Sequence, residues 1–227
     1  MIINVRGALG TQIFEYVSGL VQANKRNTNI SSININTGGN VVETVKIDWL
    51  SQVFNLPCPI HTVSSKSKQD VWRHVSYFED MCTNKEIVQQ IKLKHQIKKN
   101  NYKILHVRGK DRKVANLYDY VRLAKSIGPT VKFIGDDDYF IDDIQQATGI
   151  GENISKNAIE DWYTCIGSDE IHCAFTNFTL SAMLFDPNKK IYMLSEQNSN
   201  GEAKINSQVF RCVHVLFGNY FTNANWI

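Results

Sequence analysis

The stretch YKILHVRGKDRKVANLYDYVRLAKSIGPTVKFIG, residues 102–135, decides the fold class. It predicts an apolar strand over 102–107, a helix over 116–126 and a second apolar strand over 131–135. The alternation continues with helices over 138–147, 158–166 and about 179–185, and with strands over 170–175 and 189–194. Alternating apolar strands and helices are typical of a parallel sheet covered on both faces, so we predict an α/β fold.

The first hundred residues are also of α/β type but less regular. The sequence predicts strands over 1–5, 29–35 and 41–47, a helix from Thr11 to about Arg26, and a Pro- and Ser-containing loop over 55–70. Residues 84–99 predict a basic amphipathic helix, for which a solvated face is favoured over contact with a membrane or an anionic glycan. A polar break near residue 101 predicts two domains, 1–100 and 101–227.

Composition excludes several classes of protein. The chain has 227 residues, 43% of them hydrophobic, and a net charge of +3, which is too small to indicate nucleic acid and suits an anionic small molecule. Its five cysteines are odd in number and form no CxxC pair, so we expect free thiols in a reducing compartment. No signal peptide or transmembrane run is visible, and the expected location is the cytoplasm. The oligomeric state is left open.

The loop Gly7-Ala8-Leu9-Gly10-Thr11-Gln12 joins the first predicted strand to the first predicted helix. Glycine-rich turns in this position often hold phosphate. Its G-x-x-G spacing matches neither the dinucleotide pattern GxGxxG nor the P-loop pattern GxxxxGK[ST]. A phosphate-binding loop and a tight structural turn therefore both remain open, and a Rossmann oxidoreductase is disfavoured.

A second polar segment, ILHVRGKDR, follows the strand over 102–107. Arg108 shares a strand face with His106, and Lys110 and Arg112 add two cations at the same strand end. An arginine can hold a phosphate through two parallel hydrogen bonds. The alternative is a solvated loop in which Asp111 pairs with Arg112.

Two further segments follow predicted strands. Asp136-Asp137-Asp138 resembles a metal-binding DxD motif, but an N-cap role for Asp138 is favoured and no metal site is predicted. In the segment AFTNFTLSA, residues 174–182, the start of the predicted helix and its two threonines could hold phosphate. A plain N-cap explains the same residues.

The order of these four segments resembles the alpha-1,2-fucosyltransferases (glycosyltransferase family 11) and, more distantly, the alpha-1,6- and protein O-fucosyltransferases. Those enzymes share motifs like GGLGNQxFQY, HxRRxD, SDD and ANSSFSWWGAWL. The counterparts are residues 7–16 (GALGTQIFEY), 106–111 (HVRGKD), 135–137 (GDD) and 174–182 (AFTNFTLSA). Three departures are Thr11 in place of the Asn, Gly109 in place of the second arginine, and the absent tryptophans of the last motif. Protein O-fucosyltransferase-like members also keep only the first arginine.

The resemblance implies a GT-B-like architecture, two Rossmann-like halves facing across a cleft, in a compact variant. Residues 1–100 would be the acceptor side with the glycine loop, and residues 101–227 the donor-binding half. Arg108 would be the catalytic residue that binds the β-phosphate of GDP. The other donor-binding residues implied are Gly7, Gly10, Gln12, His106, Lys110, Asp136, Asp137, Thr176, Asn177, Phe178 and Thr179.

The implied reaction is inverting transfer of fucose from GDP-fucose to a glycan hydroxyl, without a metal or other cofactor. A fixed arginine and helix-start N–H groups can stabilise the charge that develops on GDP. The sequence assigns no general base, since Glu15 is expected too far inside the first helix. Two alternatives are a non-catalytic GDP-sugar-binding domain and a transferase of another GDP-deoxyhexose.

Overall fold

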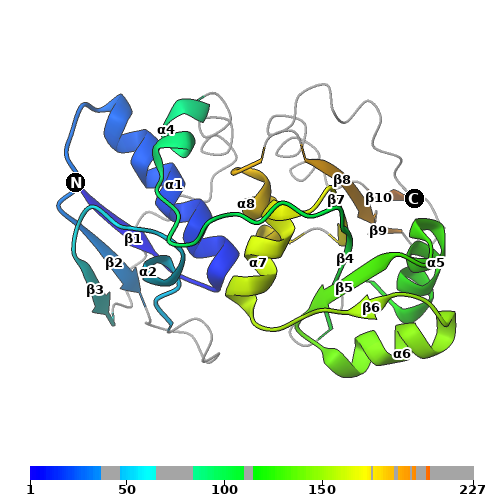
Figure 1. Ribbon diagram of the computed structural model, residues 1–227. Coiled ribbons are helices and arrows are strands. Elements are labelled where there is room, and N and C mark those ends of the chain that lie inside the picture. The colour runs from blue at the N-terminus through cyan, green and yellow to red at the C-terminus, as the bar shows by residue number, and fades with distance from the viewer. Residues whose placement is uncertain are drawn as a thin grey trace. The chain divides into compact units, whose positions relative to one another are not determined.

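The computed structural model describes residues 1–36, 47–64, 84–109, 115–174, 176–186, 189–194, 196–197 and 203–204. The chain divides into two compact units, Met1–Gln96 and Ile97–Ile227, and each is described by itself. Both units are built on parallel sheets with helices between the strands (Figure 1). The predicted α/β fold class is confirmed.

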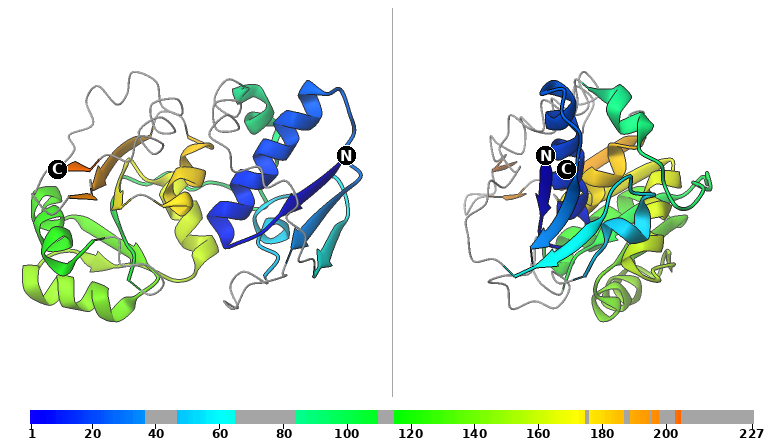
Figure 2. Two further views of the ribbon diagram at one scale, coloured as in Figure 1. Left: turned by 180° about the vertical axis from the view of Figure 1, so that it is seen from behind. Right: turned by 90° about the vertical axis from the view of Figure 1, so that its left-hand side faces the viewer.

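The first unit contains a three-stranded parallel sheet in the order β1-β2-β3. Its elements are β1 (Ile2–Val5), α1 (Leu9–Lys25), β2 (Ser32–Asn36), α2 (Leu50–Val53), β3 (Ile60–Val63) and α4 (Lys85–Gln90). The long helix α1 lies along the sheet (Figure 2). Ile3, Ile33 and Ile35 are fully buried in the core of this unit. Burial of alternate apolar side chains along a strand stabilises the folded state.

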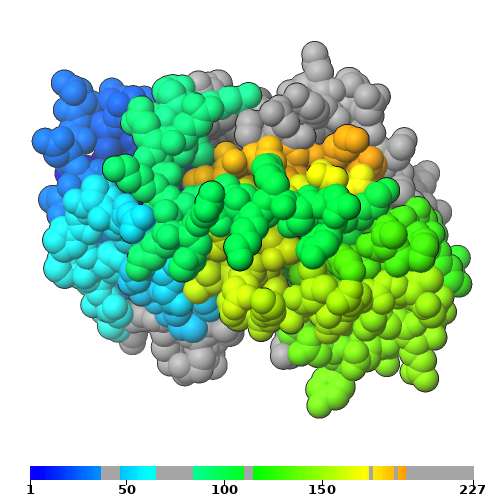
Figure 3. Space-filling view, in the orientation of Figure 1, coloured from blue at the N-terminus to red at the C-terminus, as the bar shows by residue number. Residues whose placement is uncertain are grey.

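Two predictions for this unit are wrong. Residues 60–63 were predicted as loop but form β3, which pairs with β2. The predicted helix over 84–99 ends at Gln90, because Leu93 forms a β-bridge with Phe54 and the Lys94 N–H donates to the Val53 carbonyl at 2.9 Å. The segment after α4 instead lies extended on the surface (Figure 3), with Lys92 and Lys94 exposed. The predicted strand over 41–47 lies almost wholly outside the described residues.

The second unit contains a five-stranded parallel sheet in the order β6-β5-β4-β7-β8. Its elements are β4 (Lys103–Val107), α5 (Leu117–Ile127), β5 (Val131–Gly135), α6 (Asp138–Thr148), β6 (Glu152–Asn153), α7 (Ala158–Gly167), β7 (Glu170–Ala174), α8 (Asn177–Met183) and β8 (Lys190–Leu194). A short antiparallel pair, β9 (Glu196–Gln197) and β10 (Ala203–Lys204), follows. Helices α5 and α6 lie on one side of the sheet and α7 and α8 on the other (Figure 1).

The helices of this unit begin and end where local chemistry dictates. Asn116 and Asp119 form a capping box at the start of α5, which satisfies two helix-start N–H groups. Gly149 ends α6 in the left-handed conformation at φ 68°, which glycine adopts at little cost. Between α5, α6 and the sheet lies a closed apolar core that includes Leu105, Phe133 and Tyr120, all fully buried.

Candidate functional site

The sheet order of the second unit places a topological switch point between β4 and β7. From β4 the chain proceeds outward to β5 and β6, and then returns through α7 to β7 on the other side of β4. In open α/β sheets, ligands bind at the carboxyl ends of the strands beside such a point. The residues after β4 and β7 are Arg108 and Gly109 on one side, and Thr176 and Asn177 on the other.

The backbone that follows β4 is held by two hydrogen bonds. The Arg108 N–H donates to Tyr120 Oη at 3.1 Å, and the Gly109 N–H donates to Asp136 Oδ1 at 2.9 Å. Burial raises the pKa of Tyr120 to about 12, so its hydroxyl stays neutral at physiological pH. Arg108 itself is partly exposed, and its backbone N–H is held by Tyr120 at the end of β4.

His106 joins the end of β4 to α8. Its ring stacks on the ring of Phe178 with centroids 5.0 Å apart and planes 12° apart. Burial, with a contribution from the positive charge of Arg108, lowers the pKa of His106 to about 3, so the imidazole is neutral at physiological pH. Its side chain is 7% exposed, and Nδ1 has no hydrogen-bond partner among the residues that the structure describes. Two segments distant in sequence therefore meet at one strand end.

The hydroxyl groups of the two threonines after β7 form hydrogen bonds within the start of α8. Thr176 Oγ1 accepts a hydrogen bond from the Thr179 N–H at 3.3 Å, and the two hydroxyl oxygens are 3.1 Å apart. Both residues are buried, whereas Asn177 and Phe178 are partly exposed. The N-cap alternative therefore accounts for the threonine hydroxyls, and their predicted contact with the donor stays a prediction.

The acidic segment after β5 starts α6 at Asp138, as predicted, but the N-cap lies one residue earlier than predicted. Asp137, not Asp138, is the N-cap residue, and its Oδ1 accepts from the Phe140 N–H at 3.2 Å. Asp138 lies in the first turn of α6, where its Oδ1 accepts from Asn153 Nδ2 at 3.2 Å. In the described part of the chain, no group of three or more His, Cys, Asp and Glu residues is placed to hold a metal ion.

Gly109 is required by the position of Asp137. A β-carbon at residue 109 would lie 2.5 Å from Asp137 Oδ2 and 2.7 Å from Asp137 Cβ, well inside van der Waals contact. The motif that this segment resembles has its second arginine at this position. The structure therefore gives a steric reason for one departure from the motif. Lys110, which could supply a second cation, lies outside the described residues.

The glycine loop of the first unit is held by Gln12. Gln12 Nε2 donates to the carbonyls of Gly7 and Ile47, both at 2.8 Å, and Gln12 Oε1 accepts from the Trp49 N–H at 3.2 Å. This side chain is fully buried, so its amide bonds to backbone and acts as a brace for the loop. Gly7 turns the chain at φ 86°, a conformation that favours glycine, and Gly10 lies in the first turn of α1.

Glu15 is also fully buried, and its Oε2 accepts from the Arg6 N–H at 2.6 Å. It is the seventh residue of α1, so its predicted place well inside the first helix is confirmed, and its lack of a general-base role stays a prediction. The three cysteines in the described residues, Cys58, Cys165 and Cys173, are free thiols, as predicted.

Sequence reasoning missed the groups that fix this strand end from behind. Tyr120 bonds to Arg108 at the end of β4, and Ser155 bonds to Gly135 at the end of β5. Asp161 contacts the Ser155 hydroxyl in turn. The signal available for Tyr120 was its place on the apolar face of the predicted helix over 116–126. Ser155 gave no signal, since its partners are set by the register of β5 and β6.

Comparisons with known proteins find structural similarity but no match in sequence. No protein-family model matches the chain, and no curated protein matches its sequence. The chain is similar to a crystal structure assigned as a UDP-N-acetylglucosamine 2-epimerase from Listeria monocytogenes, with 8% identity and a TM-score of 0.38. The similarity covers 92% of this chain and 72% of that one. At this TM-score the similarity adds no support to the fold assignment, which rests on the sheets and helices described above.

No helix in the described ranges is both long enough and apolar enough to cross a membrane.

Proposed function

We propose that this protein is an inverting, metal-independent glycosyltransferase that moves fucose from GDP-fucose to a glycan hydroxyl. The observation that carries the proposal is the meeting of three motif segments at the switch point of the second unit. His106 stacks on Phe178, and the Gly109 N–H donates to Asp136. Segments 106–109, 136–137 and 176–179 therefore lie together at the carboxyl ends of β4, β5 and β7. Their order along the chain resembles that of the fucosyltransferases.

In this proposal the second unit binds the donor. Arg108 holds the β-phosphate, and the partly exposed Asn177 and Phe178 border the same strand end. Asp136 and Asp137 contact the guanine or the ribose, where a carboxylate suits the N–H and NH2 edge of guanine. The remaining donor contacts proposed are His106, Lys110, Thr176 and Thr179, and in the first unit Gly7, Gly10 and Gln12, which would act through the backbone of the loop.

The chemistry requires stabilisation of a leaving diphosphate. As the bond between the anomeric carbon and the phosphate oxygen breaks, negative charge builds on GDP and positive charge builds on the sugar ring. In the proposal, the Arg108 guanidinium lies at the leaving oxygens and stabilises that charge. The backbone from which the side chain extends is held by Tyr120. The glycan hydroxyl attacks the opposite face of the anomeric carbon and gives its proton to solvent, since no side chain is assigned as the base; the product has inverted configuration.

A second candidate function is a non-catalytic GDP-sugar-binding domain. The observation that favours it is the steric closure of position 109 by Asp137, which removes the second cation of the related motif. The two candidates share the nucleotide and differ in turnover. A GDP-sugar that binds without being transferred or hydrolysed would identify the binder.

The test compares nucleotides first and variants second. GDP should raise the melting temperature of the protein by mass action, and UDP should not. With GDP-fucose and a glycan panel, Arg108→Ala should lower the rate by about a hundredfold to a thousandfold, the range for loss of one preorganised charge-stabilising group. Arg108→Lys should restore little of the rate, because an ammonium lacks the two-pronged geometry.

Arg122→Ala is the matched control, since it removes the same charge from α5 of the same unit. It should keep both binding and turnover. Equal stabilisation by UDP and GDP would contradict the proposed donor, and a normal rate in Arg108→Ala would contradict the proposed catalytic residue.

A further inference from the structure

A serine side chain replaces a missing strand partner at the end of β5. The two-residue strand β6 ends at Asn153, and the next ladder bond is donated by the Ile154 N–H to the Phe133 carbonyl at 3.0 Å. Beyond it, Ser155 Oγ lies 3.3 Å from the Gly135 nitrogen and 3.0 Å from the Gly135 carbonyl oxygen. One hydroxyl therefore contacts both backbone polar groups of the last residue of β5.

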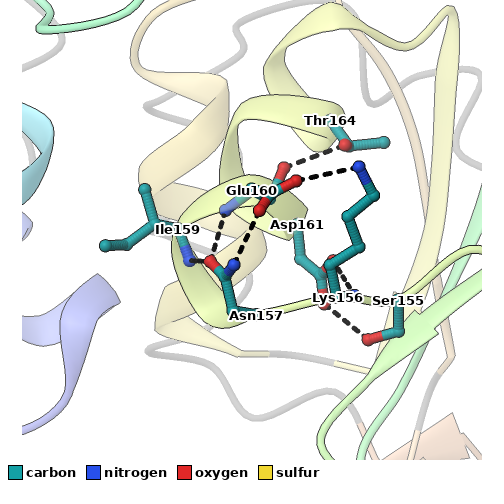
Figure 4. Close-up of polar contacts among 7 residues, drawn as sticks. All are labelled: Ser155, Lys156, Asn157, Ile159, Glu160, Asp161 and Thr164. Carbon is teal, nitrogen blue, oxygen red and sulfur yellow. Dashed lines mark hydrogen bonds and ion pairs between the residues drawn. The ribbon is translucent and has the colours of Figure 1, made fainter.

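Asp161 of α7 contacts the same hydroxyl. Asp161 Oδ2 lies 2.7 Å from Ser155 Oγ, and Asp161 Oδ1 accepts from the Lys156 N–H at 3.0 Å (Figure 4). The residue is 5% exposed, whereas its neighbour Glu160 on the first turn of α7 is exposed. The carboxyl group is thus buried directly behind the strand end that carries Asp136.

Counting protons decides the state of this carboxyl group. A serine hydroxyl has one hydrogen to donate and can accept two hydrogen bonds. If Asp161 is ionised, the hydroxyl must donate to it, and the contact with the Gly135 carbonyl is no longer a hydrogen bond. If Asp161 carries a proton, it donates to Ser155 Oγ, and the hydroxyl then donates to Gly135. Only the protonated carboxyl group satisfies all three contacts at once.

We propose that Asp161 is a positioning residue that holds a proton in the folded protein and, through Ser155 and Gly135, fixes Asp136 against the Gly109 N–H. Asp136 directly follows Gly135, and its Oδ1 is the acceptor of that N–H at 2.9 Å. That this arrangement helps the protein to bind a nucleotide rests on the proposed function. The protonation of Asp161 is independent of that function.

Burial, together with the neighbouring negative charges, favours the protonated form of Asp161. Burial raises the pKa of Asp161; the hydrogen bonds from Ser155 and the Lys156 N–H oppose this, and the negative charges of Glu160 and Asp138 add to it. Glu160 directly precedes Asp161 on α7. Its carboxylate pairs with Lys156 Nζ at 2.9 Å, so each of these two charges partly offsets the other. Asp138 faces Asp161 from the start of α6.

The sign of the pH effect follows from the raised pKa. The contribution of Asp161 to stability is fully present below the ordinary aspartate pKa of about 3.9 and is lost as pH rises through the folded pKa. Deprotonation also takes the hydroxyl hydrogen away from Gly135. Raising the pH through this range should therefore loosen the end of β5 and disturb the Gly109 N–H.

The test is a pH titration of the full chain by NMR, with aspartate side-chain carbons and backbone amides labelled. The Asp161 carbon is assigned by its loss in Asp161→Asn. We expect it to titrate above the range of exposed aspartates, and the Gly135 and Gly109 amides to shift with the same midpoint. In Asp161→Asn, whose amide donates permanently to Ser155, the two amides should stay at their low-pH positions and stability should lose this pH dependence.

Asp143→Asn, an exposed carboxylate on α6, is the matched control and should leave the titration unchanged. An Asp161 carbon that titrates in the ordinary range, or Gly135 and Gly109 amides that do not follow its midpoint, would overturn the proposal. Ser155→Ala should uncouple the Gly109 amide from pH even if it lowers stability. These readouts need no nucleotide, so a failure of the proposed function would appear separately, as an absence of GDP binding.

Discussion

Replacing Gly109 by alanine tests whether the end of β4 is packed as described. The added β-carbon would lie 2.5 Å from Asp137 Oδ2 and 2.7 Å from Asp137 Cβ. Rotation of the Asp137 side chain can relieve the first contact but not the second, so the backbone must also move. The φ angle of Gly109 lies outside the left-handed region, so alanine brings no backbone strain of its own. The whole cost is overpacking, for which about 1–3 kcal/mol of unfolding free energy is typical.

The assay is a double-mutant cycle measured by urea unfolding. Asp137→Gly removes the obstructing side chain and, as a change of N-cap residue to glycine, should cost only about a few tenths of a kcal/mol. In that background, Gly109→Ala should cost less than about 0.5 kcal/mol, which leaves a coupling free energy of at least about 0.5 kcal/mol. Equal costs of Gly109→Ala in both backgrounds would refute the steric argument. Gly109→Arg should destabilise the wild-type protein further instead of supplying the missing charge.

Three other predictions concern the glycine loop, the start of α8 and metal dependence. Gln12→Leu keeps the volume but leaves backbone partners at Gly7, Ile47 and Trp49 unsatisfied, so urea unfolding should show a loss of about 1–3 kcal/mol; a loss near zero would mean that these bonds do not brace the loop. Thr176→Val should cost about 1 kcal/mol by removing the N-cap oxygen and Thr176→Ser much less, and equal losses on thermal unfolding would argue against a capping role. Sugar transfer should survive EDTA, because the leaving charge is assigned to Arg108; activity abolished by chelation and restored by manganese would return the Asp136–Asp138 segment to metal binding.

The sequence alone determined the secondary structure of the second unit closely. Its strands are short apolar runs, and its helices carry their own start and stop signals, such as Asn116 before α5 and Gly149 after α6. Each of these residues acts on the helix turn next to it, so the helix boundary can be predicted without knowledge of any distant contact. The parallel direction of the strands also follows from the alternation, because each helix returns the chain to the end of the sheet where the previous strand began.

The first unit was harder to predict because distant pairing decides its elements. Residues 60–63 become a strand by pairing with β2, although His61 and Thr62 are exposed and give no alternating signal. The helical pattern over 84–99 is overruled after Gln90, where a bridge between Leu93 and Phe54 forms instead. Helix propensity contributes little free energy per residue, and hydrogen bonds to a distant part of the chain can outweigh it.

For the candidate site, the sequence named the residues and the tertiary structure decided their state. Arg108 and the segments after β5 and β7 could be named because polar residues follow apolar strands. The neutral state of His106, the cap at Asp137 and the occupied amide of Gln12 depend on burial and on partners far away in sequence. Desolvation and hydrogen-bond saturation are properties of the packed chain, and no pattern of spacing along the sequence carries them.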